Sequence, residues 1–251
     1  MEIHLIFLVV GSVFLGSLMR ATFGFGDSVI SMPLLALLPI PFSSAVALVG
    51  LVGFTVALFS LFNSWKQLDI IILKWLAIST VIGIPFGLLL VRFVEKRWIN
   101  LILGSLLVIY SIYSILISSK KQIQIGNDHK HLNYTIPFGF ASGMLGSAYN
   151  MNGIPIVLYS TMKDWPPKQF KENVQAHFLI SSILIIFSHY LSGFWTKEVG
   201  LYYFTSIPAV VLAIVLGNYF YSKIKVDKFR HFVIYFILLL GIFTFIDFLR
   251  G

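Results

Sequence analysis

The feature that most constrains the fold is a series of long apolar stretches that contain few charged residues. Three of them run from Leu5 to Phe23, from Ile70 to Val91 and from Val199 to Tyr221. A helix of about 20 apolar residues crosses the hydrocarbon core of a bilayer, which is about 30 Å thick. A membrane β-barrel would instead show alternating segments of about ten residues, and these stretches do not alternate. The sequence therefore predicts an all-α polytopic membrane protein.

The composition agrees with a position in the cell membrane. Charged residues make up 11% of the 251 residues and hydrophobic residues 58%, whereas about 25% of the residues in soluble domains are charged. The formal net charge is +8, but Lys and Arg lie in short clusters between apolar stretches, as topology signals and headgroup contacts do. We therefore expect the lipid bilayer as a partner and no nucleic acid. The chain has no cysteine, which excludes a thiol-based relay.

The chain divides into two sequence-related halves. A polar linker at residues 119–133 separates a first transmembrane repeat, residues 1–118, from a second, residues 134–251. The halves align at an offset of about 127 residues, which matches Gly26 with Gly153. Each half is expected to hold a broken or re-entrant pair of short helices and three full transmembrane helices. Matched pairs of short segments interrupted by Gly or Pro point to a binding site at the middle of the membrane.

The orientation of the two repeats depends on how the short helices cross the membrane. If each short pair is re-entrant, each half makes an odd number of crossings and the repeats are inverted. If each pair makes one broken crossing, the repeats are parallel. The distribution of Lys and Arg among the loops favours inverted repeats over parallel ones.

The first interruption places a carboxylate inside an apolar run, between Gly24 and Pro33. A charged Asp27 near the bilayer centre would cost about 2.5–3.5 kcal/mol on insertion scales, and desolvation favours the neutral carboxyl form. Two interpretations remain open. One is that Asp27 is a proton-coupling or gating carboxylate. The other is that Asp27 or Ser28 is the N-cap of the short helix that follows, and the two interpretations are compatible.

The second interruption lies between Tyr149 and Gly153, and a second short helix follows it. The two short helices would point their positive ends at the middle of the membrane, where a helix N-terminus is a ready anion site. The amides of Asn150 and Asn152 can donate to an anion or accept from a protonated Asp27; the alternative is a left-handed turn with a local cap. The glycines would let the backbone N–H groups come close to a ligand. The alternative is that they serve close helix packing. The expected substrate-binding residues are Gly24, Gly26, Asp27, Ser28, Tyr149, Asn150, Asn152 and Gly153.

Four further residues are secondary candidates: Arg20, Ser31, Tyr159 and His177. Arg20 would bind the substrate, pair with Asp27 or extend to the membrane interface, and the last interpretation is favoured because long basic side chains commonly do so. His177 and His189 lie twelve residues apart in one long helix, which favours hydrogen-bonded core histidines over a metal pair. We expect no metal, no cofactor and no catalytic residue.

Two motifs resemble those of the TauE/SafE sulfite-exporter family. Gly24-Phe25-Gly26-Asp27-Ser28 with Met32-Pro33 resembles the first motif of that family, and Ala148-Tyr149-Asn150 with Gly153-Ile154-Pro155 resembles the second. The resemblance implies a secondary transporter of the bacterial inner membrane, for sulfite, thiosulfate, sulfoacetate or another sulfur-containing or organic anion. Asp27-Ser28 and Met151-Asn152 stand where glycines are common in the family, which leaves the substrate open.

The motifs and the resemblance together lead to one expected function and one alternative. The expected function is secondary transport of a small anion, either sulfur-containing or a carboxylate, with proton coupling through Asp27 as an added hypothesis. The alternative is an intramembrane enzyme that acts on a lipid-like substrate, which would require Asp27 to share a cavity with His177 or His189. A homodimer is one assembly that the sequence leaves open.

Overall fold

The computed structural model describes most of the chain. The described residues are 2–23, 25–61, 67–117, 132–163, 165 and 167–223, with positions 235, 238, 239, 241, 242, 245, 246 and 249. Most of the predicted linker at residues 119–133, Gly24, and most of residues 229–248, where the last of the three full helices expected in the second half would lie, are outside them. The division into repeats therefore stays a prediction.

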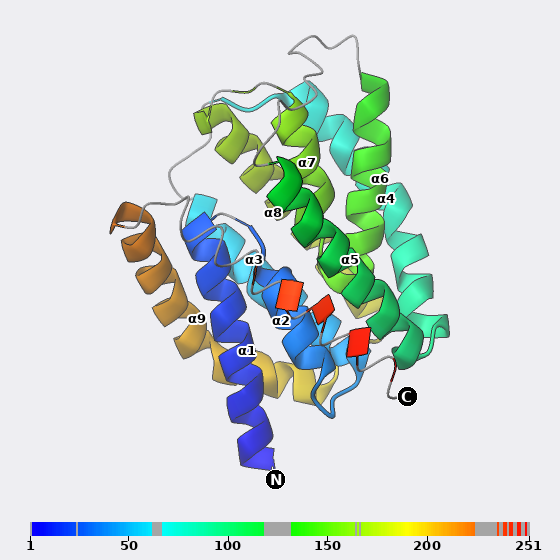
Figure 1. Ribbon diagram of the computed structural model, residues 1–251, viewed down its shortest axis with the longest axis vertical. Helices are drawn as coiled ribbons and strands as arrows, with labels where there is room; N and C mark the ends of the chain where they lie inside the picture. The colour runs from blue at the N-terminus through cyan, green and yellow to red at the C-terminus, as the bar shows by residue number, and fades with distance from the viewer. Residues whose placement is uncertain are drawn as a thin grey trace.

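Within the described residues every regular element that is assigned is an α-helix, in agreement with the predicted fold class (Figure 1). Five of these helices, α1, α3, α4, α8 and α9, are long and apolar enough to cross a membrane, so the chain is a multi-pass membrane protein. The helices are α1 (Glu2–Phe23), α2 (Asp27–Ala36), α3 (Phe42–Leu61), α4 (Ile70–Phe93), α5 (Lys96–Ile117), α6 (Leu132–Tyr149), α7 (Gly153–Met162), α8 (Pro167–Leu191) and α9 (Lys197–Lys223).

Two of the helices, α2 and α7, are too short to span a bilayer. Each has ten residues and is therefore about 15 Å long, half the thickness of the hydrocarbon core. A turn containing Pro39 and Pro41 separates α2 from α3, because proline lacks the N–H that would extend the helix. Helix α2 is almost fully buried inside the bundle, whereas the described side chains of α7 are buried or half-buried. Each helix begins immediately after a tight turn.

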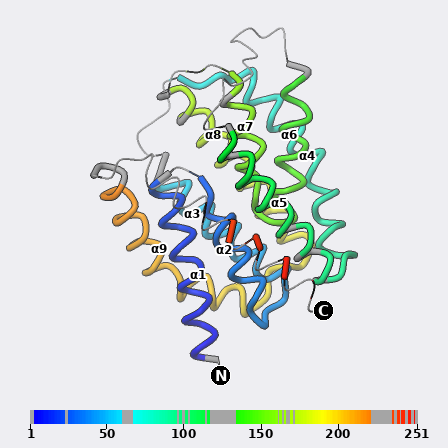
Figure 2. Tube along the Cα trace, viewed as in Figure 1, coloured from blue at the N-terminus to red at the C-terminus, as the bar shows by residue number. Residues whose placement is uncertain are grey.

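The longer helices pack across the boundary between the predicted halves. The most extensive contacts are those of α4 with α6 and of α1 with α9, and α3 packs on α8 near the centre. Figure 2 shows α1 beside α9 on one side of the molecule and α4 beside α6 on the other. In the predicted halves, α1 corresponds to α6, α3 to α8 and α4 to α9. If each helix is replaced by its counterpart, the same three pairs result, which is the pattern expected when two related halves interlock.

Glycines let the helices of these pairs approach each other closely. A Cβ atom at Gly83 of α4 would overlap the carbonyl oxygen of Phe140 of α6, and one at Gly143 of α6 would overlap that of Thr80 of α4. At Gly217 of α9 an added Cβ would lie 2.5 Å from the side chain of Ala21 of α1. Small residues have this role in lipid, where helix association depends on close van der Waals packing.

Candidate functional site

The two interruptions line a common pocket in the interior of the bundle. We name the turn before α2 the first break and the turn before α7 the second break. The pocket joins the turn before α2 to the turn before α7, and α8 contributes one wall. The space open to the centre of a water molecule is about 10 Å³, which is room for about one water. The lining residues are Arg20, Phe25, Gly26, Asp27, Ser28, Val29, Met151, Asn152, Gly153, Ile154 and Phe178.

Both short helices start without a side-chain cap. Gly26 occupies the cap position of α2 with φ 94°, a left-handed conformation that glycine adopts without strain, and Asn152 occupies that of α7. Neither helix start receives a hydrogen bond from the side chain of its cap residue. The interpretation of Asp27 or Ser28 as the N-cap is therefore wrong: Asp27 is the first residue of α2, and its side chain is directed elsewhere.

Asp27 forms a buried ion pair with Arg20. Arg20 Nη1 donates to Asp27 Oδ2 at 2.7 Å, and the two residues are only 4% and 7% exposed. The favoured interpretation of Arg20, extension to the interface, is wrong because the chain folds back through Gly26 and brings α2 alongside the end of α1. An isolated buried charge costs several kcal/mol, so the pairing allows both side chains to lie in the apolar interior.

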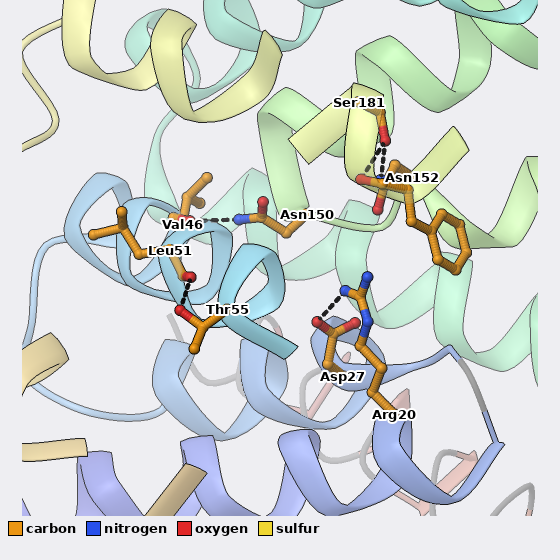
Figure 3. Close-up of polar contacts among 9 residues, drawn as sticks. Arg20, Asp27, Val46, Leu51, Thr55, Asn150, Asn152 and Ser181 are labelled. Carbon is orange, nitrogen blue, oxygen red and sulfur yellow. Dashed lines mark hydrogen bonds and ion pairs between the residues drawn. The ribbon is translucent and has the colours of Figure 1, made fainter. Parts of the chain in front are cut away.

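The ion pair leaves part of the Arg20 guanidinium unused. Its Nε and Nη2 atoms are buried and have no hydrogen-bond partner among the described residues. The guanidinium lies 5.2 Å from the centre of the Phe178 ring, a cation–π contact. Figure 3 shows it extending from α1 toward the second break, where Asn152 lies. Because an unsatisfied buried donor costs about 1–3 kcal/mol, these donors mark a place where a ligand with acceptor oxygens would be stabilised.

The amides of the second break are bound to neighbouring helices. Asn150 has φ 55°, and its Nδ2 donates to the carbonyl of Val46 in α3. Asn152 Nδ2 donates to Ser181 Oγ of α8 at 2.6 Å. Of the two interpretations of Asn150, the structure supports the left-handed turn, whereas Asn152 also lines the pocket. Neither amide contacts Asp27 in this arrangement (Figure 3).

Three of the predicted polar residues lie away from the pocket. Tyr149 is buried and packs edge-on against Phe42 at 5.9 Å between ring centres. Ser31 Oγ donates to the carbonyl of Ser12 at 3.1 Å and so ties α2 to α1. The hydroxyl of Tyr159 lies 2.9 Å from that of Thr135. These three residues stabilise helix contacts around the site. Gly24, which was also predicted to bind the substrate, lies outside the described residues.

The two histidines of α8 are hydrogen-bonded core residues, as the sequence favoured. His177 Nε2 lies 3.2 Å from Thr80 Oγ1 of α4. His189 Nε2 donates to the carbonyl of Ser147, near the end of α6, at 2.9 Å. Neither lines the pocket with Asp27. In the described part of the chain, no three His, Asp or Glu side chains are grouped so that they could hold a metal ion.

Two glycines of α3 that the sequence did not single out face the two breaks. A Cβ atom at Gly53 would lie 2.8 Å from Asp27 Oδ2 and 3.1 Å from Arg20 Nη1, and one at Gly50 would lie 3.1 Å from Asn150 Oδ1. Two small residues three positions apart in an apolar helix were the available signal. No signal distinguished Phe178 from the many other phenylalanines of the chain.

Comparison with known proteins gives one match. The family model described as sulfite exporter TauE/SafE matches residues 8–244, which is nearly the whole chain and includes both breaks. No curated protein and no solved structure matches the chain.

Proposed function

Because the chain belongs to the TauE/SafE sulfite exporter family, we propose that it is a secondary transporter of a small anion, with the substrate held between the two breaks. The observation that carries this proposal is the buried guanidinium of Arg20, whose Nε and Nη2 have no partner among the described residues. The family is one of membrane transporters, so a small-molecule substrate and a lipid bilayer follow from membership. The bacterial inner membrane as the location is part of the proposal.

The charges around the pocket suit an anion. Arg20 is the one cationic side chain among the described lining residues, and the starts of α2 and α7 adjoin the same space. Helix N-termini carry a partial positive charge and favour anions. A guanidinium binds carboxylates and oxyanions through paired hydrogen bonds. The proposed substrates are therefore sulfite, thiosulfate, an organosulfonate such as sulfoacetate, or a simple carboxylate.

The size of the pocket implies that the described arrangement is closed around the site. A space for about one water does not accommodate an anion of four or more heavy atoms. Binding then requires the first and second breaks to separate, for example by movement of α8, which contributes Phe178 to the wall and bonds Asn152 through Ser181. Alternating exposure of a central site is the general scheme for transporters built from repeats.

Asp27 competes with the substrate for Arg20 in this proposal. While Asp27 is ionised, its Oδ2 occupies Arg20 Nη1 and its charge repels an incoming anion. Protonation of Asp27 would remove that charge and release Nη1, so we include proton coupling through Asp27 in the proposed function.

The test is anion flux in proteoliposomes with sulfite, thiosulfate, sulfoacetate and acetate as substrates. We expect saturable flux of at least one of them. The double variant Arg20→Gln/Asp27→Asn, which removes both charges together, should lose it. Arg92→Gln is the matched control because Arg92 is exposed near the end of α4. Normal flux in the double variant would contradict the proposed site, and no flux of any anion by the wild-type protein would contradict the proposed function.

The alternative of an intramembrane enzyme gains no support from the pocket. That alternative needs a histidine beside Asp27, and His177 and His189 are instead bonded to Thr80 and Ser147. We therefore propose transport alone.

A further inference from the structure

The pocket contains one positive and one negative side chain, and the described lining residues include no other ionisable group. Among the helices packed on α2, α1 contributes Arg20, α3 places Gly53 beside Asp27, and no residue of α5 lines the pocket. From α8 the pocket receives Phe178, while the neighbouring His177 contacts Thr80 of α4. The net charge of the pocket is therefore set by Arg20, Asp27 and whatever binds there.

This charge balance restricts what the pocket can hold. The closed pocket is neutral because Arg20 and Asp27 compensate each other. A monoanion bound beside an ionised Asp27 would leave one uncompensated negative charge in a buried space, which is strongly unfavourable. If Asp27 carries a proton, the same monoanion leaves the pocket neutral. A dianion leaves a net negative charge in either case.

Protonation also changes the role of the Asp27 side chain. An ionised carboxylate only accepts hydrogen bonds, whereas a protonated carboxyl group has an O–H that donates. Asp27 Oδ2 approaches Gly53 closely, since a Cβ atom there would lie 2.8 Å from it, so no other side chain lies between this oxygen and α3. The protonated group would thus stop competing with the anion and become one of its donors, together with Nη1, Nη2 and Nε of Arg20.

We propose that the substrate is a monoanion and that each one is carried with one proton on Asp27, so that transport is electroneutral. This inference rests on the proposed function. A proton from the aqueous phase adds to the Asp27 carboxylate, the Arg20–Asp27 bond breaks, and the guanidinium binds the anion. On the other side of the membrane the anion and the proton leave, and the ion pair forms again. The substrate class is a sulfonate, hydrogen sulfite or carboxylate that carries a single charge.

The experiment measures steady-state accumulation of methanesulfonate, hydrogen sulfite and acetate in proteoliposomes, with sulfate as the dianion probe. The membrane potential is set with potassium and valinomycin, and an internal pH dye reports protons. For the wild-type protein, accumulation of the transported monoanion should follow the pH gradient, stay the same at 0 and 100 mV, and bring in one proton per anion. Sulfate should not accumulate.

A matched pair of variants sharpens the test. In Asp27→Asn, residual anion flux should move no protons, and 100 mV should change the accumulation about 50-fold, the ratio that corresponds to about 2.3 kcal/mol per charge. Glu95→Gln, at an exposed carboxylate between α4 and α5, should behave like the wild type. If Asp27→Asn does not fold, the wild-type measurement decides alone.

The outcomes separate the two proposals. Wild-type accumulation that follows the potential without proton movement would overturn electroneutral coupling and leave anion transport standing. Equal accumulation of sulfate and methanesulfonate would overturn the monoanion restriction. Absence of flux for all probes would overturn both this inference and the proposed function.

Discussion

The two breaks each contain a residue of positive φ, but they differ in where it lies and in their side chains. Gly26 immediately precedes the ten-residue helix α2, whereas Met151 and Asn152 separate Asn150 from the ten-residue helix α7. The first break carries a charged pair whose members bind each other. The second carries amides that bind α3 and α8. The difference teaches that the first break is held by a pair formed within it, whereas the second is held by bonds to neighbouring helices.

The largest effect should come from breaking the charged pair. Arg20→Gln leaves a buried carboxylate unpaired, and removal of one member of a buried pair typically costs about 3–5 kcal/mol. We expect a large loss of thermal stability in detergent, together with loss of anion binding. Arg20→Gln/Asp27→Asn should recover stability but not binding, measured by fluorescence-detected unfolding with and without anion. Stability unchanged in Arg20→Gln would show that the pair is not what holds the first break.

The next largest effect should come from the second break, and it should be on stability alone. Asn150→Ala removes the bond to Val46 and places alanine at φ 55°, where a side chain without a local hydrogen bond costs about 1–2 kcal/mol. Asn150→Gly also removes the bond, but glycine adopts this φ without strain. We expect alanine to lower the unfolding temperature more than glycine, with anion affinity unchanged in both. Equal effects would mean that the backbone conformation does not contribute.

The two glycines of α3 offer a direct comparison of the breaks. Gly53→Ala would place a methyl group 2.8 Å from Asp27 Oδ2, so the ion pair must shift, whereas Gly50→Ala would place one 3.1 Å from Asn150 Oδ1. A shift of the pair should weaken anion binding about tenfold, equivalent to about 1.4 kcal/mol. Gly50→Ala should change it little. Titration of anion-induced thermal stabilisation measures both, and the reverse order would contradict the assignment of the anion to Arg20.

The smallest effect should come from Ser181→Ala. The substitution removes the acceptor of Asn152 Nδ2 and should lower stability by about 1 kcal/mol. Because the amide lines the pocket, it then becomes available to an anion, so affinity should stay the same or rise slightly. A clear loss of anion affinity would show that the orientation of Asn152, which Ser181 fixes, matters for binding.

The sequence was a good guide to local structure and a poor one to partners. Long apolar runs and prolines predicted the helices, and the glycines predicted the breaks, because these signals act within a few residues. The location of Arg20 depended on α2 folding back beside α1, which no local pattern encodes. The partners of Asn150 and Asn152 come from α3 and α8, more than 25 residues away in each case. Helix pairing in lipid follows from surface shape, as at Gly83 and Gly217, and hydrophobicity alone does not select it.

The pairing of α1 with α9 also sets an order of events during synthesis. Helix α6 follows α4 after a short interval, so that pair can form early. Helix α9 begins at Lys197, far downstream of the end of α1 at Phe23, and at about 5–20 residues per second its synthesis begins roughly nine to thirty-five seconds later. During that delay α1 lies in the membrane without its main partner. The pairing of Arg20 with Asp27, only seven residues apart, is available from the first moments, and it keeps the newly inserted helix free of an isolated charge until α9 arrives.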